Sequence, residues 1–238
     1  MAGHILLEGG MEFGGMMSEP DRVAIKLAGG EDALISIIPT AAAPDKNDQN
    51  AGRNGVLWFR SLGARHVESL PIIDRQTAND PDIAAKLRQS NLIYLLGGFP
   101  GYLAETLKDT LCWQAALEAY EAGAVLGGSS AGAMVFCQYY YDPQQSLVAE
   151  GLNLLPNTCV LPHFNNFGKG WAKLLSTKLP TVVLVGIDEQ TGMIDDAHGG
   201  SKVGWHVYGA GSVTLYHNGE PTEYRAGESF KDNFIMDV

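Results

Sequence analysis

The chain has 238 residues, of which 45% are hydrophobic and 18% charged, and its formal net charge at pH 7 is −11. This composition is typical of a globular protein, and the length suffices for one α/β domain or two small ones. The acidic balance argues against nucleic acid or an anionic membrane as the main partner. No apolar run approaches the ~20 residues that span a bilayer.

The N-terminal stretch and the cysteines both indicate a cytoplasmic protein. Residues 1–7 have no basic region and continue directly into Glu8-Gly9-Gly10, which predicts a first strand and its turn rather than a signal peptide. Cys112, Cys137 and Cys159 are odd in number and widely spaced. We therefore expect reduced, mostly buried thiols.

Short apolar runs that end in glycine, proline or small residues recur in the first half of the chain. Such runs are typical of parallel strands buried on both faces of a sheet. The predicted strands lie at residues 5–7, 33–38, 66–70, 92–96 and 124–126, and helical patterns alternate with them at 48–62, 81–89 and 102–120. The alternation predicts a doubly wound, mainly parallel α/β sheet, which binds ligands at the carboxyl ends of its strands.

After about residue 142 the pattern changes. Runs at 152–155, 158–161 and 182–185 resemble strands, residues 168–179 can form a helix, and Asn218-Gly219 is a strong hairpin signal. We expect the C-terminal third to add antiparallel strands to the parallel sheet. No linker or repeat interrupts the chain, so we predict a single domain over residues 1–238.

A glycine-serine stretch follows the fifth predicted strand. Gly128-x-Ser130-x-Gly132 has the spacing of a nucleophile elbow, in which a tight strand-to-helix turn exposes a serine hydroxyl above the end of a sheet. The same spacing also fits a structural bend without chemistry, because short glycine motifs occur by chance.

A serine nucleophile needs a base, and His163 is the histidine best placed to supply one. It follows Val160-Leu161-Pro162 at the end of a predicted strand, whereas the remaining five histidines lie within strands, turns or loops. Those five are His4, His66, His198, His206 and His217. Only 33 positions separate Ser130 from His163, which is too few for the strand order of an α/β-hydrolase.

Several motifs together resemble one family of serine peptidases, peptidase family S51, which includes aspartyl dipeptidase and cyanophycinase. The motifs are Leu96-Gly97-Gly98, Gly128 to Ala133, Gly151 to Pro156, Pro162-His163-Phe164 and Gly186-Ile187-Asp188-Glu189. The resemblance implies a flavodoxin-like fold related to class I glutamine amidotransferases. It also implies that Ser130 is the nucleophile and His163 the base.

The resemblance further implies that the backbone N–H groups of Gly98 and Ala131 bind the oxyanion. For the acid of the triad, the family pattern favours Asp142, and Glu150 is the alternative. The amidotransferase positions for a cysteine and a glutamate are occupied here by Ser130 and Asn165, which argues against glutamine hydrolysis.

The expected substrate-binding residues are Phe99, Asn165 and Asn166. The arginines that cyanophycinases carry after the histidine are missing from residues 164–171, so cyanophycin cleavage is not favoured. We predict a hydrolase that acts on small peptides, an exopeptidase or dipeptidase, with no metal and no organic cofactor. An amidase or esterase for other substrates, and an inactive relative that only binds ligands, are the alternatives. A homodimer is left open.

Overall fold

The computed structural model describes residues 3–196 and 204–231, and its largest element is an eight-stranded sheet of order β14-β11-β10-β1-β5-β4-β2-β3. Five strands of this sheet are parallel, and β10, β11 and β14 extend it in antiparallel fashion beyond β1. The parallel strands are β1 (His4–Glu8), β2 (Leu34–Ile38), β3 (His66–Ser69), β4 (Leu92–Leu95) and β5 (Val125–Ser129). The antiparallel strands are β10 (Thr191–Ile194), β11 (Trp205–Gly209) and β14 (Ser229–Phe230).

Helices cover both faces of this sheet because side chains of each buried strand point alternately to the two sides. Leu6 packs in one apolar cluster with α1 (Ser18–Leu27) and α2 (Asp48–Ser61). Ile5 and Leu7 pack on the opposite face in a cluster with four further helices. These are α3 (Pro81–Gln89), α4 (Pro100–Leu107), α5 (Leu111–Glu121) and α6 (Ala131–Phe136). The predicted doubly wound α/β architecture is confirmed.

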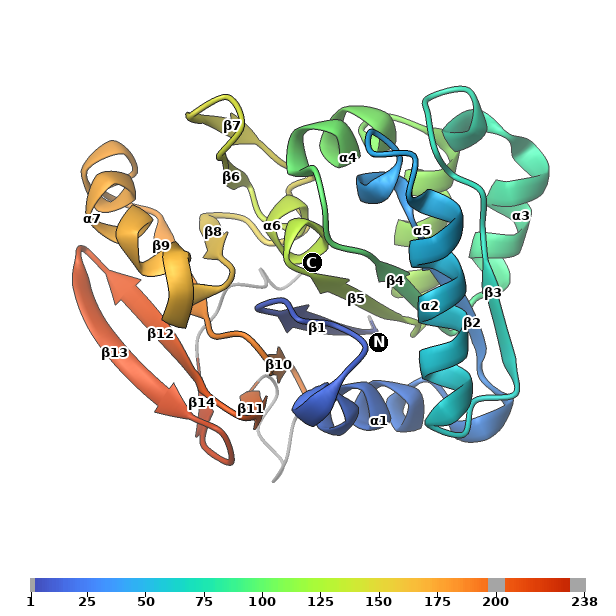
Figure 1. Ribbon diagram of the computed structural model, residues 1–238, viewed down its shortest axis with the longest axis horizontal. Coiled ribbons are helices and arrows are strands. Elements are labelled where there is room, and N and C mark those ends of the chain that lie inside the picture. The colour runs from blue at the N-terminus through green and yellow to red at the C-terminus, as the bar shows by residue number, and fades with distance from the viewer. Residues whose placement is uncertain (1–2, 197–203, 232–238) are drawn as a thin grey trace.

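A second sheet, of order β13-β12-β9-β8, lies beside the first at the left of Figure 1. Its strands are β8 (Thr158–Leu161), β9 (Val183–Ile187), β12 (Ser212–His217) and β13 (Glu220–Arg225). Helix α7 (Lys169–Lys178) connects β8 to β9, which are parallel. A separate hairpin pairs β6 (Tyr139–Asp142) with β7 (Leu147–Glu150).

The C-terminal strands depart in part from the sequence-based expectation. The Asn218-Gly219 hairpin is confirmed, since both residues have positive φ and join β12 to β13. However, these two strands belong to the second sheet, and only β10, β11 and β14 extend the parallel one. The strand expected at residues 152–155 is wrong, because that segment forms no strand.

The long helix expected at residues 102–120 is divided into α4 and α5. The break falls at Asp109, whose φ is 57°, and at Thr110, which begins α5 as its N-cap. The Thr110 hydroxyl accepts a hydrogen bond from the backbone N–H of Trp113 at 3.4 Å. A threonine cap satisfies a free N–H of a helix end and so favours a new helix start here. Within the described ranges, no helix is long and apolar enough to cross a bilayer.

Candidate active site

The site lies where the two sheets meet, at the carboxyl ends of their parallel strands. The main sheet contributes Gly9 and Gly10 after β1, Gly97 and Gly98 after β4, and Ser130 after β5. The second sheet contributes His163 after β8 and Glu189 after β9. The loop after β1 joins the two groups, because the carbonyl oxygens of Gly9 and Gly10 accept hydrogen bonds from the backbone N–H groups of His163 and Gln190.

Ser130 occupies a strained turn between β5 and α6. Its φ of 49° and ψ of −110° lie outside the regions that L residues favour, and its N–H donates to the carbonyl oxygen of Glu8 at 3.0 Å. A Cβ on Gly128 would lie 2.5 Å from the Gly132 carbonyl carbon, and one on Gly132 would lie 2.2 Å from the Leu95 carbonyl oxygen. The two flanking glycines are therefore required for the turn to close.

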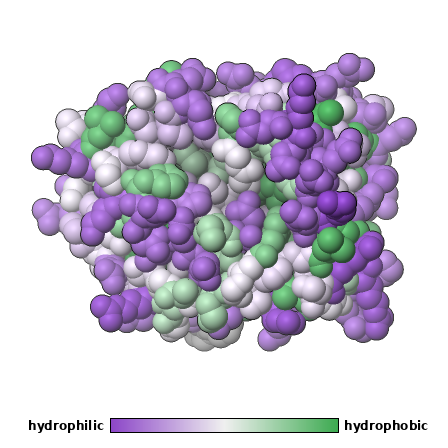
Figure 2. Space-filling view, in the orientation of Figure 1, coloured by the Kyte–Doolittle hydropathy of each residue, from purple (hydrophilic) through white to green (hydrophobic). Residues whose placement is uncertain are grey.

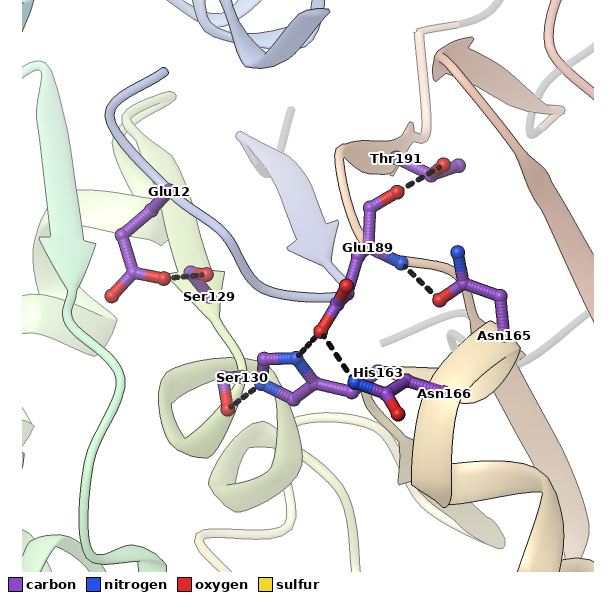
Figure 3. Close-up of polar contacts among 8 residues, drawn as sticks. All are labelled: Glu12, Ser129, Ser130, His163, Asn165, Asn166, Glu189 and Thr191. Atoms are coloured by element: carbon purple, nitrogen blue, oxygen red, sulfur yellow. Dashed lines mark hydrogen bonds and ion pairs between the residues drawn. The ribbon is translucent and has the colours of Figure 1, made fainter. Parts of the chain in front are cut away.

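Two hydrogen bonds join a serine, a histidine and a carboxylate in sequence. Ser130 Oγ lies 3.1 Å from His163 Nε2, and His163 Nδ1 lies 2.8 Å from Glu189 Oε1 (Figure 3). The ionised carboxylate can only accept, so Nδ1 carries the proton that it donates to Glu189. The lone pair of Nε2 then faces the Ser130 hydroxyl, which is the arrangement of a nucleophile and its general base.

The His163 ring is fixed from several sides. The residue has a left-handed backbone, with φ 49° and ψ 41°, and its N–H donates to the carbonyl oxygen of Gly9 at 2.7 Å. A Cβ on Gly10 would lie only 2.3 Å from the ring atom Cε1. The Phe167 ring stacks on the imidazole with centroids 4.9 Å apart. The imidazole thus lies between Gly10, where any side chain would collide with the ring, and the aromatic ring of Phe167.

Glu189 is held by the turn that follows His163. The Glu189 N–H donates to Asn165 Oδ1 at 3.0 Å, and Asn166 Nδ2 donates to the Glu189 carboxylate at 3.4 Å. The hydrogen bond from His163 lowers the pKa of Glu189, so its carboxylate is ionised at neutral pH. The carboxylate can therefore both orient the imidazole and stabilise its charged form.

The carboxylate beside His163 is neither Asp142 nor Glu150, and the sequence-based assignment of the acid is corrected here. Asp142 ends β6, where its buried carboxylate accepts hydrogen bonds from the backbone N–H groups of Gln144 and Gln145. Glu150 is exposed and pairs with Lys108 at 3.4 Å. The β6–β7 hairpin turns both carboxylates to other partners, whereas the parallel pairing of β8 with β9 brings Glu189 beside His163.

A signal for Glu189 is present in the sequence. Gly186-Ile187-Asp188-Glu189 is one of the motifs that carry the family resemblance, and it ends a predicted strand. Carboxyl ends of parallel strands gather at one edge of a sheet, so a carboxylate there is a candidate on position alone. Glu189 follows the histidine in the chain, whereas both expected acids precede it.

The other predicted site residues divide into two groups. Gly98 and Phe99 line the same cavity as Ser130 and His163, whereas Asn165 and Asn166 both hydrogen bond to Glu189. A Cβ on Gly98 would lie 2.2 Å from the Ala41 carbonyl oxygen, so this position requires glycine. Ala131 follows Ser130 and is buried.

The cavity in front of Ser130 has a volume of about 460 Å³ and is lined by both apolar and polar residues. Its wall includes Glu12, Asp45, Asn47 and Asn54, and none of the described residues that line it is a lysine or arginine. This size is in the range of small-molecule sites. Figure 2, in the orientation of Figure 1, shows a face on which hydrophilic residues predominate toward the left and right and mix with more apolar residues at the centre.

Glu12 and Ser129 lie beside the hydrogen-bonded group of Ser130, His163 and Glu189, and neither was predicted from the sequence as a site residue. Ser129 Oγ donates to Glu12 Oε2 at 2.9 Å, and the Gly97 N–H donates to Glu12 Oε1 at 3.3 Å. In Figure 3 the hydroxyls of Ser129 and Ser130 point to different partners, Glu12 and His163. Of the two adjacent serines, Ser130 is therefore the one that faces the imidazole.

The remaining histidines and the cysteines lie apart from this group. His4 and His206 contact Asp195 and Asp196, His66 is exposed, and His198 lies outside the described residues. All three cysteines are free and buried, as expected. Across the described part of the chain, no three His, Cys, Asp or Glu side chains are grouped as metal ligands.

Comparison with proteins of known sequence identifies relatives in the same peptidase group. Cyanophycinase from Synechococcus elongatus is 35% identical over 200 residues, which are 79% of this chain and 60% of that protein. Cyanophycinase from Trichormus variabilis is 31% identical over 92% of this chain and 74% of its own length. The chain thus spans less than two thirds of the first of these relatives.

Solved structures agree in fold. A peptidase from an acI-B1 Actinobacterium superposes with a TM-score of 0.84 at 30% identity, covering 98% of each chain. A putative peptidase E from Listeria monocytogenes has a TM-score of 0.62 at 21% identity over 95% of this chain and all of that one, which is a likeness of fold. The fold is the flavodoxin-like fold of these peptidases. The model of peptidase family S51 matches residues 6–198, and the chain therefore belongs to peptidase family S51.

Proposed function

We propose that this protein is a serine peptidase that hydrolyses short peptides, with Ser130 as nucleophile, His163 as general base and Glu189 as the orienting acid. The observation that carries the proposal is the continuous line of hydrogen bonds from Ser130 Oγ through the imidazole to Glu189. This line supplies the three roles that acyl transfer by a serine requires.

In the first half of the reaction, Ser130 Oγ attacks the scissile carbonyl carbon while His163 Nε2 takes the hydroxyl proton. The carbonyl oxygen becomes an oxyanion, for which the N–H groups of Gly98 and Ala131 are the proposed donors. His163 then gives its proton to the leaving amine and an acyl-enzyme remains. A water molecule, deprotonated by His163, releases the acyl group and restores Ser130.

Short peptides are favoured because of the size of the cavity. The space of about 460 Å³ is lined by Phe99 and by residues of the loop after β1, among others. Two of the relatives are named cyanophycinases, and that name states their activity and not the activity of this chain. Among the described residues the cavity wall holds no lysine or arginine, so it is poorly suited to a substrate side chain that carries a carboxylate.

The test combines labelling with hydrolysis. A fluorophosphonate probe should add once to the protein, and peptide mapping should place the adduct on Ser130 rather than on Ser129. Ser130→Ala should abolish both labelling and hydrolysis of a dipeptide library while leaving the thermal unfolding curve unchanged. A folded protein without labelling would contradict the nucleophile. Faster hydrolysis of simple acyl esters than of any peptide would favour the amidase or esterase alternative.

A further inference from the structure

The carboxylate of Glu12 lies beside the proposed oxyanion site, and no positively charged residue that the structure describes pairs with it. It accepts hydrogen bonds from Ser129 Oγ and from the Gly97 N–H, which are both neutral groups. A Cβ placed on Gly97 would lie 3.0 Å from Glu12 Oε1 and 3.2 Å from Ser130 Cβ. The carboxylate and the nucleophile are therefore neighbours on the same face of Gly97.

The surroundings add negative charge instead of cancelling it. Asp45 lines the same cavity, and no lysine or arginine in the described part of the chain does. Within residues 3–196 and 204–231, neither Glu12 nor Asp45 forms an ion pair. His163 also lines this cavity, and its ring is engaged between Ser130 and Glu189.

An unpaired carboxylate at this place opposes the reaction, because it raises the energy of an oxyanion that forms nearby. A substrate that brings its own positive charge removes the conflict and gains a charge-assisted hydrogen bond. In a peptide cleaved after its first residue, the α-ammonium is two bonds from the scissile carbonyl carbon, at about 2.5 Å. It is therefore the cation that every such substrate presents next to Gly97.

We propose that Glu12, supported by Asp45, binds the α-ammonium group of the substrate and thereby restricts the enzyme to the first peptide bond of peptides with a free N-terminus. This inference rests on the proposed function, and it names the substrate group that the same site binds. It also implies that an acidic first residue is disfavoured, because its side chain would enter a cavity that already holds two carboxylates.

The experiment compares alanyl and N-acetyl-alanyl derivatives of the same fluorogenic amide, with wild type, Glu12→Gln and Glu121→Gln. The last variant makes the same change in charge at an exposed residue of α5 that does not line the cavity. Wild type and Glu121→Gln should prefer the free amine by about 10- to 100-fold in kcat/KM, the range expected for one charge-assisted hydrogen bond. Glu12→Gln should lose this preference, mainly through a higher KM for the free amine.

Labelling of Ser130 by a neutral fluorophosphonate separates binding of the ammonium group by Glu12 from a structural role of Glu12 in the serine turn. The probe carries no ammonium group, so only a structural role would affect it. Glu12→Gln should be labelled at least as fast as wild type. If both amides and the labelling slow by the same factor, Glu12 only supports the serine turn and the inference is wrong. Equal rates for the two amides in wild type would also overturn it, although the serine mechanism would stand.

If turnover of these amides is slow, the same question can be answered by measuring how well dipeptides protect Ser130 from the fluorophosphonate. Ala-Ala should protect Ser130 from the probe at lower concentration than N-acetyl-Ala-Ala, and Glu12→Gln should remove the difference. Asp-Ala should protect less well than Ala-Ala. Equal protection by the free and acetylated dipeptides would contradict the inference, whereas a complete absence of labelling would contradict the proposed function itself.

Discussion

The imidazole ring of His163 packs directly against the backbone of Gly10. A Cβ on Gly10 would lie 2.3 Å from Cε1 and 2.6 Å from Nε2 of His163. The φ of Gly10 is +110°, so an alanine there is also strained by its own backbone. The loop after the first strand thus sets the position of a ring that lies more than 150 residues later in the chain.

Gly10→Ala should abolish hydrolysis because the new methyl group displaces the imidazole from Ser130. The matched control is Gly123→Ala, since Gly123 has the same φ of +110° but an added Cβ there would meet no side chain within 4 Å. Both variants should lose stability of about 1–2 kcal/mol from the positive φ. Only Gly10→Ala should lose kcat, measured beside thermal unfolding. Equal activity of the two variants would show that the ring is not held by this contact.

Glu189→Gln should lower kcat by about 10²- to 10⁴-fold, because an amide no longer fixes the tautomer of His163 or stabilises its charged form. Glu150→Gln should leave kcat near the wild-type value, since its exposed carboxylate pairs with Lys108 and not with His163. Steady-state kinetics of both variants, with circular dichroism to verify folding, decide the matter. A large loss in Glu150→Gln with little effect in Glu189→Gln would reverse the assignment.

Asn165→Ala should lower kcat and leave KM nearly unchanged. Its Oδ1 accepts the hydrogen bond of the Glu189 N–H at 3.0 Å, so the amide positions the acid and indirectly His163. An expected loss of about tenfold is typical of such supporting contacts. If KM rises instead while kcat is kept, Asn165 binds substrate, as its place in the sequence suggests.

The sequence predicted those parts of the site that depend on local backbone geometry. Gly128 and Gly132 mark a turn that larger residues cannot form, and Pro162-His163-Phe164 marks a strand end, so both are recognisable without a structure. The start of α5 is also marked locally, by the N-cap Thr110, although the regular spacing of leucines across it suggests one continuous helix.

Glu189, the carboxylate that contacts His163, was not predicted from the sequence because this contact depends on how two distant strands pair. Leu161 aligns with Gly186 in the parallel β8–β9 ladder, and this register brings the residues after each strand together. Asp142 is nearer to His163 in the sequence, but the β6–β7 hairpin turns its carboxylate back onto Gln144 and Gln145. Which of three carboxylates meets the imidazole is thus decided by tertiary structure.

Two fully buried carboxyl groups beneath the site make stability depend on pH. Among the described residues, Glu8 and Asp21 each have one carboxyl oxygen without a hydrogen-bond partner, and the charge of Asp21 further raises the pKa of Glu8. Tyr94 donates to Glu8, and Trp58 Nε1 donates to Asp21 at 2.7 Å. Burial raises the pKa of Glu8 well above its ordinary value and that of Asp21 to about 7.

A carboxyl whose pKa is higher in the folded than in the unfolded state stabilises the fold at low pH, and this contribution is lost as pH rises through the folded pKa. The Asp21 contribution should therefore decline from about pH 4 to beyond pH 7. His4, whose pKa is raised by Asp195, acts in the same direction, whereas Glu189, whose pKa is lowered, acts at acid pH in the opposite one. The contribution of the buried carboxyl groups is therefore obtained by comparing the pH dependence of stability between wild type and a variant of one of them.

Asp21→Asn should flatten the dependence of the melting temperature on pH between about pH 5 and pH 8, because the amide cannot ionise and still accepts the hydrogen bond of Trp58. Relative to wild type, the variant should gain stability as pH rises. Glu121→Gln, an exposed change of the same charge, should follow the wild-type curve. Thermal unfolding at closely spaced pH values provides the measurement. Parallel curves for wild type and Asp21→Asn would show that Asp21 titrates alike in the folded and unfolded chains.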